Sequence, residues 1–527
     1  MSRPGSQVDS LEPLTRRRPQ GWWDAGPNEP VPDNGLGPIA SKRSVAAQPI
    51  VEEELPFVAA PERANQTQRN VADNAPSTEP SVGKPADEVK PEVTESWLVR
   101  RGHALTYIGI FLFTLVLYFR PYELLPGLEA FSSMALILAA ATLAIYFPAQ
   151  FSLEGNLTAK PVEIKLVFAL TILAIISIPM GISAANSWAT FTEIYIKAVL
   201  MFVVIINVAR TEGRLNGLLW LALGVGIMVS LIAFGDFRSG ARAVDGYRVE
   251  GTGRGMFGNP NDMALHLVMM TPIAIALLLR TRAISKKILF GSIAMLLIVG
   301  NVLTYSRGGF LGLAVAMCVL AWKLGKGRRL QVMLGAGLFG IFFMIVAPGN
   351  YGLRIASIFF PSLDPVGSSK VREGHLIQSI LVTLRNPLAG IGMGNFNLVS
   401  NHGQVTHNAF TQVSSEIGVA ALVVYVAFMV YPLWQLFKIE TETRGVKSSS
   451  KYYYLAVGLQ AGIAGYMVTS FFASVAYQWY IYYLIGYAVC LRRIYRTRPE
   501  AEAEPARPAL APGAVPEFST NLPRTVT

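Results

Sequence analysis

The sequence predicts an all-helical protein that crosses a membrane about twelve times. Of its 527 residues, 52% are hydrophobic. Residues 98–496 consist mainly of apolar runs of about the length that spans a bilayer. Lys and Arg gather in every second connection between these runs, which is the pattern of the positive-inside rule. These observations predict a polytopic membrane domain rather than several soluble ones.

Twelve apolar runs are long enough to be spans. They lie at about 104–119, 127–147, 165–182, 191–209, 214–236, 261–280, 287–304, 309–324, 329–347, 417–437, 452–473 and 476–491. With the N-terminus in the cytoplasm, every inner connection carries Lys or Arg. Because twelve is an even number, both termini are expected in the cytoplasm.

The two ends of the chain differ from this domain. Residues 1–97 and 497–527 are polar and rich in Pro and Glu, which predicts disordered cytoplasmic tails. The net charge of +11 could indicate a nucleic-acid partner, but the basic inner connections explain much of it, so none is expected. Cys318 and Cys490 lie in separate spans and indicate no disulfide framework.

One connection is much longer than the others. Residues 348–416 are expected to form a large periplasmic loop region over the bundle. It holds Arg372, Arg385, His402, His407, Asn408 and Glu416. Arg307 lies in the short outer connection Tyr305-Ser306-Arg307-Gly308-Gly309, which fixes its guanidinium near the membrane surface. Arg248 and Arg254 lie between the fifth and sixth spans.

These outer residues fit the transfer of a glycan from a polyprenyl diphosphate. Guanidinium groups match phosphate oxygens in a planar fork and can neutralise the leaving diphosphate without a metal. The acceptor hydroxyl needs a general base, for which His375, His402 and His407 are the candidates. The outer side has no Asp-x-Asp pair, so we expect no metal and no cofactor.

A few ionisable residues lie inside the predicted spans. Glu193 and Lys197 stand four residues apart in the span 191–209 and could pair on one helix face. An ion pair and a functional role are both open. Asp262 and His266 stand one turn apart at the outer end of the span 261–280.

Several short motifs occur in a characteristic order. They are Arg254-Gly255-Met256-Phe257-Gly258-Asn259-Pro260-Asn261, Tyr305-Ser306-Arg307-Gly308-Gly309, Asn386-Pro387-Leu388-Ala389-Gly390-Ile391-Gly392 and His407-Asn408. Together with Arg372 in the long loop, they resemble the O-antigen ligase and polymerase superfamily. The resemblance is best over residues 210–440.

The resemblance leaves the subclass open. In the ligases a His-Asn pair is followed after nine residues by glycine, as His407-Asn408 and Gly418 are here. Three residues later the ligases have Gly, Thr or Tyr, where this chain has Ala421. In the polymerases an arginine is followed eleven residues later by glycine in two outer loops, and Arg242 with Gly253 fits one of them.

The resemblance implies a metal-independent, inverting glycosyltransferase of GT-C-type architecture in the bacterial inner membrane. The donor would be an undecaprenyl-diphosphate-linked glycan, and the acceptor a glycan, lipid A core or another hydroxyl. Arg307 and Arg372 would hold the diphosphate, and His407 would orient or deprotonate the acceptor. Arg248, Arg254, Asn408, Glu416, Arg385 and His402 are the candidate substrate-binding residues. The alternative is a polysaccharide or lipid-linked sugar transporter or flippase.

Overall fold

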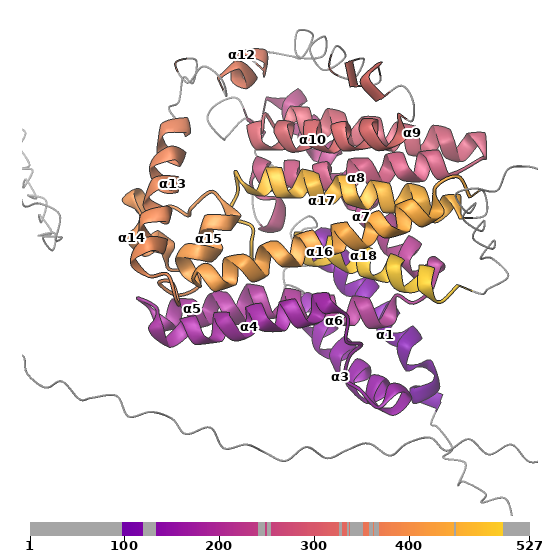
Figure 1. Cartoon of the computed structure of the whole chain (residues 1–527), viewed down its shortest axis with the longest axis horizontal. Coiled ribbons are helices and arrows are strands. Elements are labelled where there is room, and N and C mark those ends of the chain that lie inside the picture. Colours follow the sequence, from indigo (N-terminus) through magenta and orange to yellow (C-terminus); the bar gives the residue numbers. More distant parts are fainter. Residues whose placement is uncertain are drawn as a thin grey trace, which may run out of the picture. The chain divides into compact units, whose positions relative to one another are not determined.

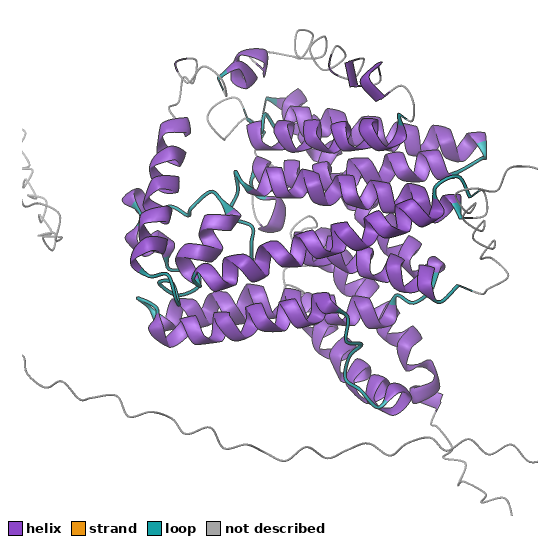
Figure 2. Cartoon of the chain, in the orientation of Figure 1, coloured by secondary structure: helices purple, strands orange, loops and turns teal. Residues whose placement is uncertain are grey.

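A computed structural model describes the helical part of the chain. It covers residues 97–119, 133–240, 248–249, 255–325, 368–446 and 449–498, with short pieces between 329 and 362. Every regular element of this part is a helix (Figure 2). The prediction of an all-helical, polytopic membrane protein is confirmed. The expected tails, Arg254 and most of the expected span 329–347 lie outside the described residues.

The helices follow the predicted spans closely. The long ones are α1 (Trp97–Phe119), α3 (Met134–Glu154), α4 (Val162–Met180), α7 (Glu212–Ser239), α8 (Pro260–Arg280), α9 (Ile284–Leu303), α10 (Arg307–Leu324), α16 (Val419–Thr443), α17 (Ser450–Ser470) and α18 (Trp479–Arg496). The expected span 191–209 is a longer rod of α5 (Ala184–Thr190), a π-helical turn η2 (Phe191–Tyr195) and α6 (Ile196–Val208).

Nine helical segments of the described part are long and apolar enough to cross a membrane, counting the α5–α6 rod as one. The helices α17 and α18 match two further predicted spans but are not among the nine. The count of twelve and the GT-C-type architecture stay predictions. Large apolar side chains on outward faces, such as Ile137 (64% exposed) and Val423 (63%), are suited to contact with lipid.

The helix α18 is surrounded by other parts of the protein. Tyr480, Tyr482, Tyr483 and Tyr487 are all buried, and their neighbours come from the other helices. Three of their hydroxyls have partners: Tyr480 donates to Met256 O, Tyr482 donates to Ala476 O, and Tyr483 shares a hydrogen bond with Thr114. Because protein surrounds it, α18 does not need the apolar surface of a lipid-facing helix.

The packing around α17 depends on small residues. This helix contacts α8, α10 and α16, and α8, α10 and α17 run side by side in Figure 1. At Gly312 of α10, a side chain would collide with Thr469 and with the carbonyl of Gly465 on α17. Glycine therefore lets the two backbones approach closely, as small residues do between membrane helices.

The remaining elements precede α16, and all of them except α13 are short. They are the 3-10 turn η3 (Gly255–Phe257), α12 (Tyr351–Ala356), α13 (Ser368–Arg385), α14 (Phe396–Val399), the 3-10 turn η6 (Asn401–Gly403) and α15 (Ala409–Glu416). Figure 1 shows α13, α14 and α15 gathered at one end of the helices. We call this end the α13 end. The expected loop 348–416 is thus largely helical where the structure describes it.

Ion pairs tie the helices together at the opposite end. Arg492 of α18 donates to both carboxylate oxygens of Glu163 at the start of α4, at 2.6 and 2.7 Å. Glu440 of α16 pairs with Lys323 of α10 at 2.5 Å and with Arg444 at 2.6 Å. The pairs Arg492–Glu163 and Lys323–Glu440 join helices that are far apart in the sequence.

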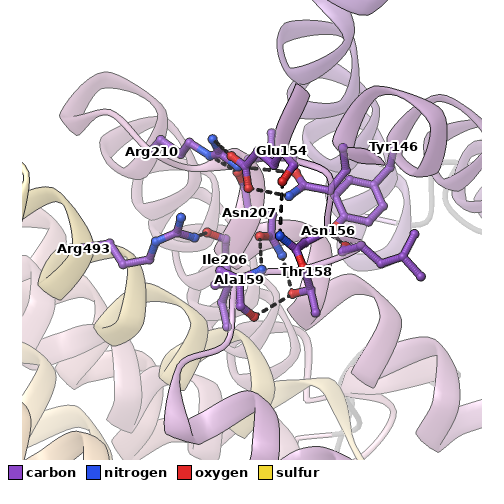
Figure 3. A network of polar contacts seen from close by, with 12 residues as sticks. Tyr146, Glu154, Asn156, Thr158, Ala159, Ile206, Asn207, Arg210 and Arg493 are labelled. Carbon is purple, nitrogen blue, oxygen red and sulfur yellow. Dashed lines mark hydrogen bonds and ion pairs between the residues drawn. The ribbon is translucent and has the colours of Figure 1, made fainter. Parts of the chain in front are cut away.

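A second polar network at this end fixes the connection between α3 and α4 (Figure 3). The side chain of Asn207 donates to Thr158 at 2.8 Å and accepts from the backbone N–H of Ala159 at 2.9 Å. Arg210 pairs with Glu154 at the end of α3. Arg493 of α18 donates to the carbonyl of Ile206 at 2.5 Å. The network holds the α3–α4 connection against the end of α6.

The Glu163–Arg492 pair predicts a stability effect. The carboxylate of Glu163 is fully buried and the Arg492 side chain is 7% exposed. We expect Arg492→Met to lower the free energy of unfolding by about 3–5 kcal/mol, because it leaves a buried carboxylate without its partner. The loss is measured as a lower thermal midpoint of the purified protein.

Two further variants complete this test. Glu163→Leu combined with Arg492→Met should recover most of the loss, because no unpaired charge remains. Arg496→Met, at an exposed position one turn further along α18, should have little effect. An Arg492→Met protein as stable as this control would contradict the prediction.

Candidate functional site

A cavity of about 250 Å³ lies at the α13 end. It is lined by Arg307 and Leu311 of α10; Ser357; Arg372, Glu373 and Leu376 of α13; Thr406, His407 and Asn408 before α15; and Phe471 and Phe472 after α17. We call it the Arg307 cavity. Four predicted site residues, Arg307, Arg372, His407 and Asn408, thus meet at one cavity although the first and last are 101 positions apart in the sequence.

A tight turn presents Arg307 to this cavity. The connection between α9 and α10 is only three residues long, and Tyr305 has a left-handed backbone with φ of 53°. Such a backbone costs a residue other than glycine about 1–2 kcal/mol. Ser306 caps α10, since its hydroxyl accepts from the N–H of Gly309 at 3.2 Å. Arg307 is therefore fixed as the first residue of α10.

Arg248 supports this turn from inside the protein. Its side chain is 3% exposed. Its Nε donates to the carbonyl of Thr304 at 3.3 Å, and its Nη2 donates to Oδ1 of Asn261 at 2.8 Å. The same oxygen accepts from the Ser306 hydroxyl at 2.9 Å. Arg248 does not line the Arg307 cavity, so its described contacts are those of a positioning residue.

The dipeptide His407-Asn408 enters the cavity at the start of α15. His407 also has a left-handed backbone, with φ of 53°. Asn408 is the N-cap of α15, and its Oδ1 accepts from the N–H groups of Phe410 and Thr411 at 2.9 and 3.1 Å. Its Nδ2 is buried and has no hydrogen-bond partner in the described protein. An amide donor at the cavity is therefore available to a ligand.

The surroundings of His407 keep its imidazole neutral. Burial lowers its pKa to about 4, with smaller contributions from the positive charge of Arg372 and from His375. The rings of His375 and His407 stack with centroids 5.9 Å apart and planes inclined by 17°. Nε2 of His375 lies 3.2 Å from the carbonyl of Asn401 and must carry a proton to donate to it. At neutral pH, His407 therefore carries no charge and can accept a proton.

Glu416 makes its described contacts with protein groups at the end of α15. It is buried and accepts from the N–H groups of Gly394 and Phe396 at 2.8 and 3.3 Å and from Tyr477 at 2.8 Å. Burial raises its pKa to about 7, although these three donors act in the opposite direction. Glu416 does not line the Arg307 cavity. Its contacts join α14, α15 and the connection between α17 and α18.

The glycine run 390–394 also contacts protein. Gly390, Gly392 and Gly394 have φ angles of 65°, 92° and 75°, which favour glycine. The N–H groups of Ile391 and Gly392 donate to the carbonyls of Ser415 and Glu416, both at 2.9 Å. These described contacts return the chain to the helical bundle.

Arg385 is not brought to this cavity. Arg385 is exposed at the far end of α13, thirteen residues or about 20 Å of helix beyond Arg372. The side chain of His402 and all of Arg254 lie outside the described residues. Sequence reasoning missed Thr406, Phe471 and Phe472, which complete the wall. The only signal for the two phenylalanines was their place at the outer end of a predicted span.

A comparison with protein families matches residues 292–426 to the family described as O-antigen ligase. This segment begins within α9, ends within α16 and includes Arg307, Arg372 and His407. No protein with a curated function matches the chain. The resemblance drawn from the sequence motifs is confirmed over this segment.

The N-cap at Asn408 predicts a graded stability effect. Asn408→Ala removes the oxygen that accepts from the first turn of α15, and we expect a loss of about 1 kcal/mol in the free energy of unfolding. Asn408→Ser keeps a capping oxygen and should retain most of the stability. Thermal unfolding of the purified variants measures the difference. Equal midpoints for the two would contradict a capping role.

Proposed function

Starting from membership of the O-antigen ligase and polymerase superfamily, which the match over residues 292–426 supports, we propose that the chain is a glycosyltransferase. It moves a glycan from polyprenyl diphosphate to a hydroxyl group at the periplasmic face of the bacterial inner membrane. The observation that carries the proposal is the Arg307 cavity. Arg307, Arg372 and His407, chosen from the sequence for this chemistry, line one cavity.

The donor's diphosphate binds between Arg307 and Arg372. Guanidinium groups make strong, charge-assisted hydrogen bonds to phosphate oxygens. Asn408 adds a neutral donor, because its buried Nδ2 has no hydrogen-bond partner among the described residues. As the bond between the sugar carbon and the phosphate oxygen breaks, the two arginines stabilise the charge that grows on the leaving group. No metal is needed for this step in the proposed mechanism.

His407 accepts the proton of the acceptor hydroxyl. The hydroxyl oxygen attacks the sugar carbon from the side opposite the diphosphate, and the configuration at that carbon is inverted. Burial is the main cause of the lowered pKa of His407, and the positive charge of Arg372 lowers it further. A bound diphosphate that offsets the charge of Arg372 raises the pKa again. His407 thus becomes a stronger base when the donor is in place.

The charge distribution supports the periplasmic assignment. Basic residues such as Arg280, Lys323 and Arg492 lie at the end opposite the α13 end, and cytoplasmic connections are enriched in Lys and Arg. The α13 end then faces the periplasm, where the undecaprenyl-linked donor is presented. Lipid A core and a growing glycan are both acceptors of the right chemistry, and the proposal includes ligase and polymerase activity.

Single substitutions in the Arg307 cavity test this mechanism. We expect Arg307→Ala and Arg372→Ala to lower glycan transfer about 10–100-fold, the value of one hydrogen bond to a charged group. His407→Ala should lower it about 10²–10⁴-fold. Transfer from purified lipid-linked glycan, with core lipid and repeat units offered separately, is the measurement.

Lys370→Ala is the matched control for these arginine variants. It removes a positive charge from the same helix at an exposed position that does not line the cavity. Transfer should stay close to the wild-type rate. If all three cavity variants kept the rate of this control, the mechanism would be wrong.

The environment of His407 also predicts a pH dependence. In the free enzyme, protonation of His407 should lower kcat/KM only as the pH falls toward about 4. Arg372→Gln removes a positive neighbour and should shift this acid limb to higher pH. The profile is measured from initial transfer rates between pH 3 and 8. An acid limb that stays in place in Arg372→Gln would contradict the proposed coupling.

A further inference from the structure

A second cavity, of about 610 Å³, lies on the other side of the α17–α18 connection. Its walls are mostly apolar and include Phe113 of α1, Ala139 of α3, Met201 of α6 and Trp479 of α18. Three ionisable side chains also line it, namely Glu193, Lys197 and Asp262. We call it the Glu193 cavity. The O-antigen ligase match does not include α1, α3, α6 or α18.

The three charged side chains are not used to hold the helices together. Among the ion pairs within 4 Å in the described part of the chain, none joins Glu193 to Lys197, and none involves Asp262. The helical pair that their spacing allows is therefore not formed in the described structure. Ionisable groups in membrane helices are costly and generally face a cavity or a polar partner. Glu193, Lys197 and Asp262 all line the cavity.

A local distortion of the helix places Glu193 there. The residues Phe191–Tyr195 form a π-helical turn between α5 and α6. Such a turn contains one residue more than an α-helical turn. The side chains that follow it therefore point in a different direction around the helix axis than they would in a continuous α-helix. Short π-helical turns inside α-helices occur frequently at functional sites. The distortion lies in the part of the rod that borders the Glu193 cavity.

The two cavities share one wall. In the α17–α18 connection, Phe471 and Phe472 face the Arg307 cavity, while Ser474 and Gln478 face the Glu193 cavity. The Ser474 hydroxyl is hydrogen-bonded to the Thr406 hydroxyl at 2.8 Å. Thr406 lines the Arg307 cavity one residue before His407. A ligand in the second cavity is thus separated from the first by a single connection.

Most charged side chains that line the Arg307 cavity are positive, whereas most of those that line the Glu193 cavity are negative. The Arg307 cavity has two arginines and one glutamate, which suits an anion. The Glu193 cavity has two carboxylates and one ammonium group, and a diphosphate would be repelled there. Carboxylates and the amide of Gln478 accept hydrogen bonds from hydroxyl groups. Apolar walls with an aromatic side chain suit the body of a lipid.

We propose that the Glu193 cavity binds the hydroxyl-rich head group of a glycolipid, with Glu193 and Asp262 accepting hydrogen bonds from its sugar hydroxyls. The apolar part of the ligand lies against α1 and α3. That this ligand is the acceptor of glycan transfer rests on the proposed function. The binding itself does not, and the two parts are tested separately.

The binding test uses the full-length protein in lipid nanodiscs and a radiolabelled alkyl maltoside with a photoreactive group in its alkyl chain. We expect light-induced labelling of α3 and α6 that excess unlabelled maltoside removes. Glu193→Gln and Asp262→Asn should each reduce it at least fivefold, and Arg307→Ala should leave it unchanged. An alkyl phosphocholine probe with the same chain should label these helices at least fivefold less.

A steric variant keeps the binding test decisive if a carboxylate variant fails to fold. Ala139→Phe places a ring in the cavity without changing a charge, and it should also reduce labelling at least fivefold. Ile137→Phe, on the same helix but 64% exposed and away from the cavity lining, is its control. Equal labelling by the two probes, or labelling unaffected in Ala139→Phe, would overturn the proposal.

A kinetic test addresses the acceptor assignment. In Glu193→Gln and Ala139→Phe, the KM for a glycolipid acceptor should rise about tenfold or more, the value of one hydrogen bond to a charged group. The KM for the lipid-linked donor should not change. A rise in the donor KM instead would assign the cavity to the donor's lipid and overturn the acceptor role. Labelling without any transfer by the wild-type protein would refute the proposed function and leave the binding site standing.

Discussion

A single oxygen atom, Oδ1 of Asn261, determines how the Arg307 cavity is built. It accepts hydrogen bonds from Arg248 and from Ser306, and it belongs to the first turn of α8. It therefore connects the segment before η3, the start of α8 and the turn between α9 and α10. A cation at a membrane surface would otherwise extend toward lipid phosphates. Here the backbone that carries Arg307 is fixed before any ligand arrives.

The same principle of fixing the backbone first applies to the other side of the cavity. Asn408 caps α15, and Glu416 at the end of that short helix holds the turn before α14 and contacts Tyr477. The strained backbone of His407 lies just before this well-anchored helix. Strain of this kind persists only where the surroundings determine the conformation. Both left-handed non-glycine residues of the described part thus lie beside the cavity.

Hydropathy and motif order predicted much of this arrangement, but not the direction of side chains. The sequence predicts the spans because each apolar run is about as long as a bilayer is thick and is bounded by polar residues. Arginine and histidine suit diphosphate binding and proton transfer, and the resemblance to the O-antigen ligase superfamily singles out Arg307, Arg372 and His407. Arg248 and Glu416, also predicted to bind substrate, make their described contacts with protein groups. The sequence gives the type of a charged residue near a loop, but it does not show whether the side chain faces a ligand or a neighbouring turn.

Two other features left no signal that could be read from the chain. The π-helical turn at Phe191–Tyr195 lies inside an apolar run whose hydropathy does not change. The wall between the two cavities is made of Phe471, Phe472 and Ser474, which read as the ordinary end of a span. Both depend on contacts between distant segments. Periodicity along one segment contains no information about such contacts.

The tyrosine-rich helix α18 has a consequence for how the protein is made. In lipid its hydroxyl groups would have no partners, and such groups are costly there. Their partners belong to segments that precede α18 in the chain, such as Thr114 and Met256. The ribosome therefore completes this helix only after the surfaces that receive it have been synthesised. We therefore expect α18, the last helix of the described part, to dock into a groove of protein that is already synthesised, rather than to partition alone into the bilayer.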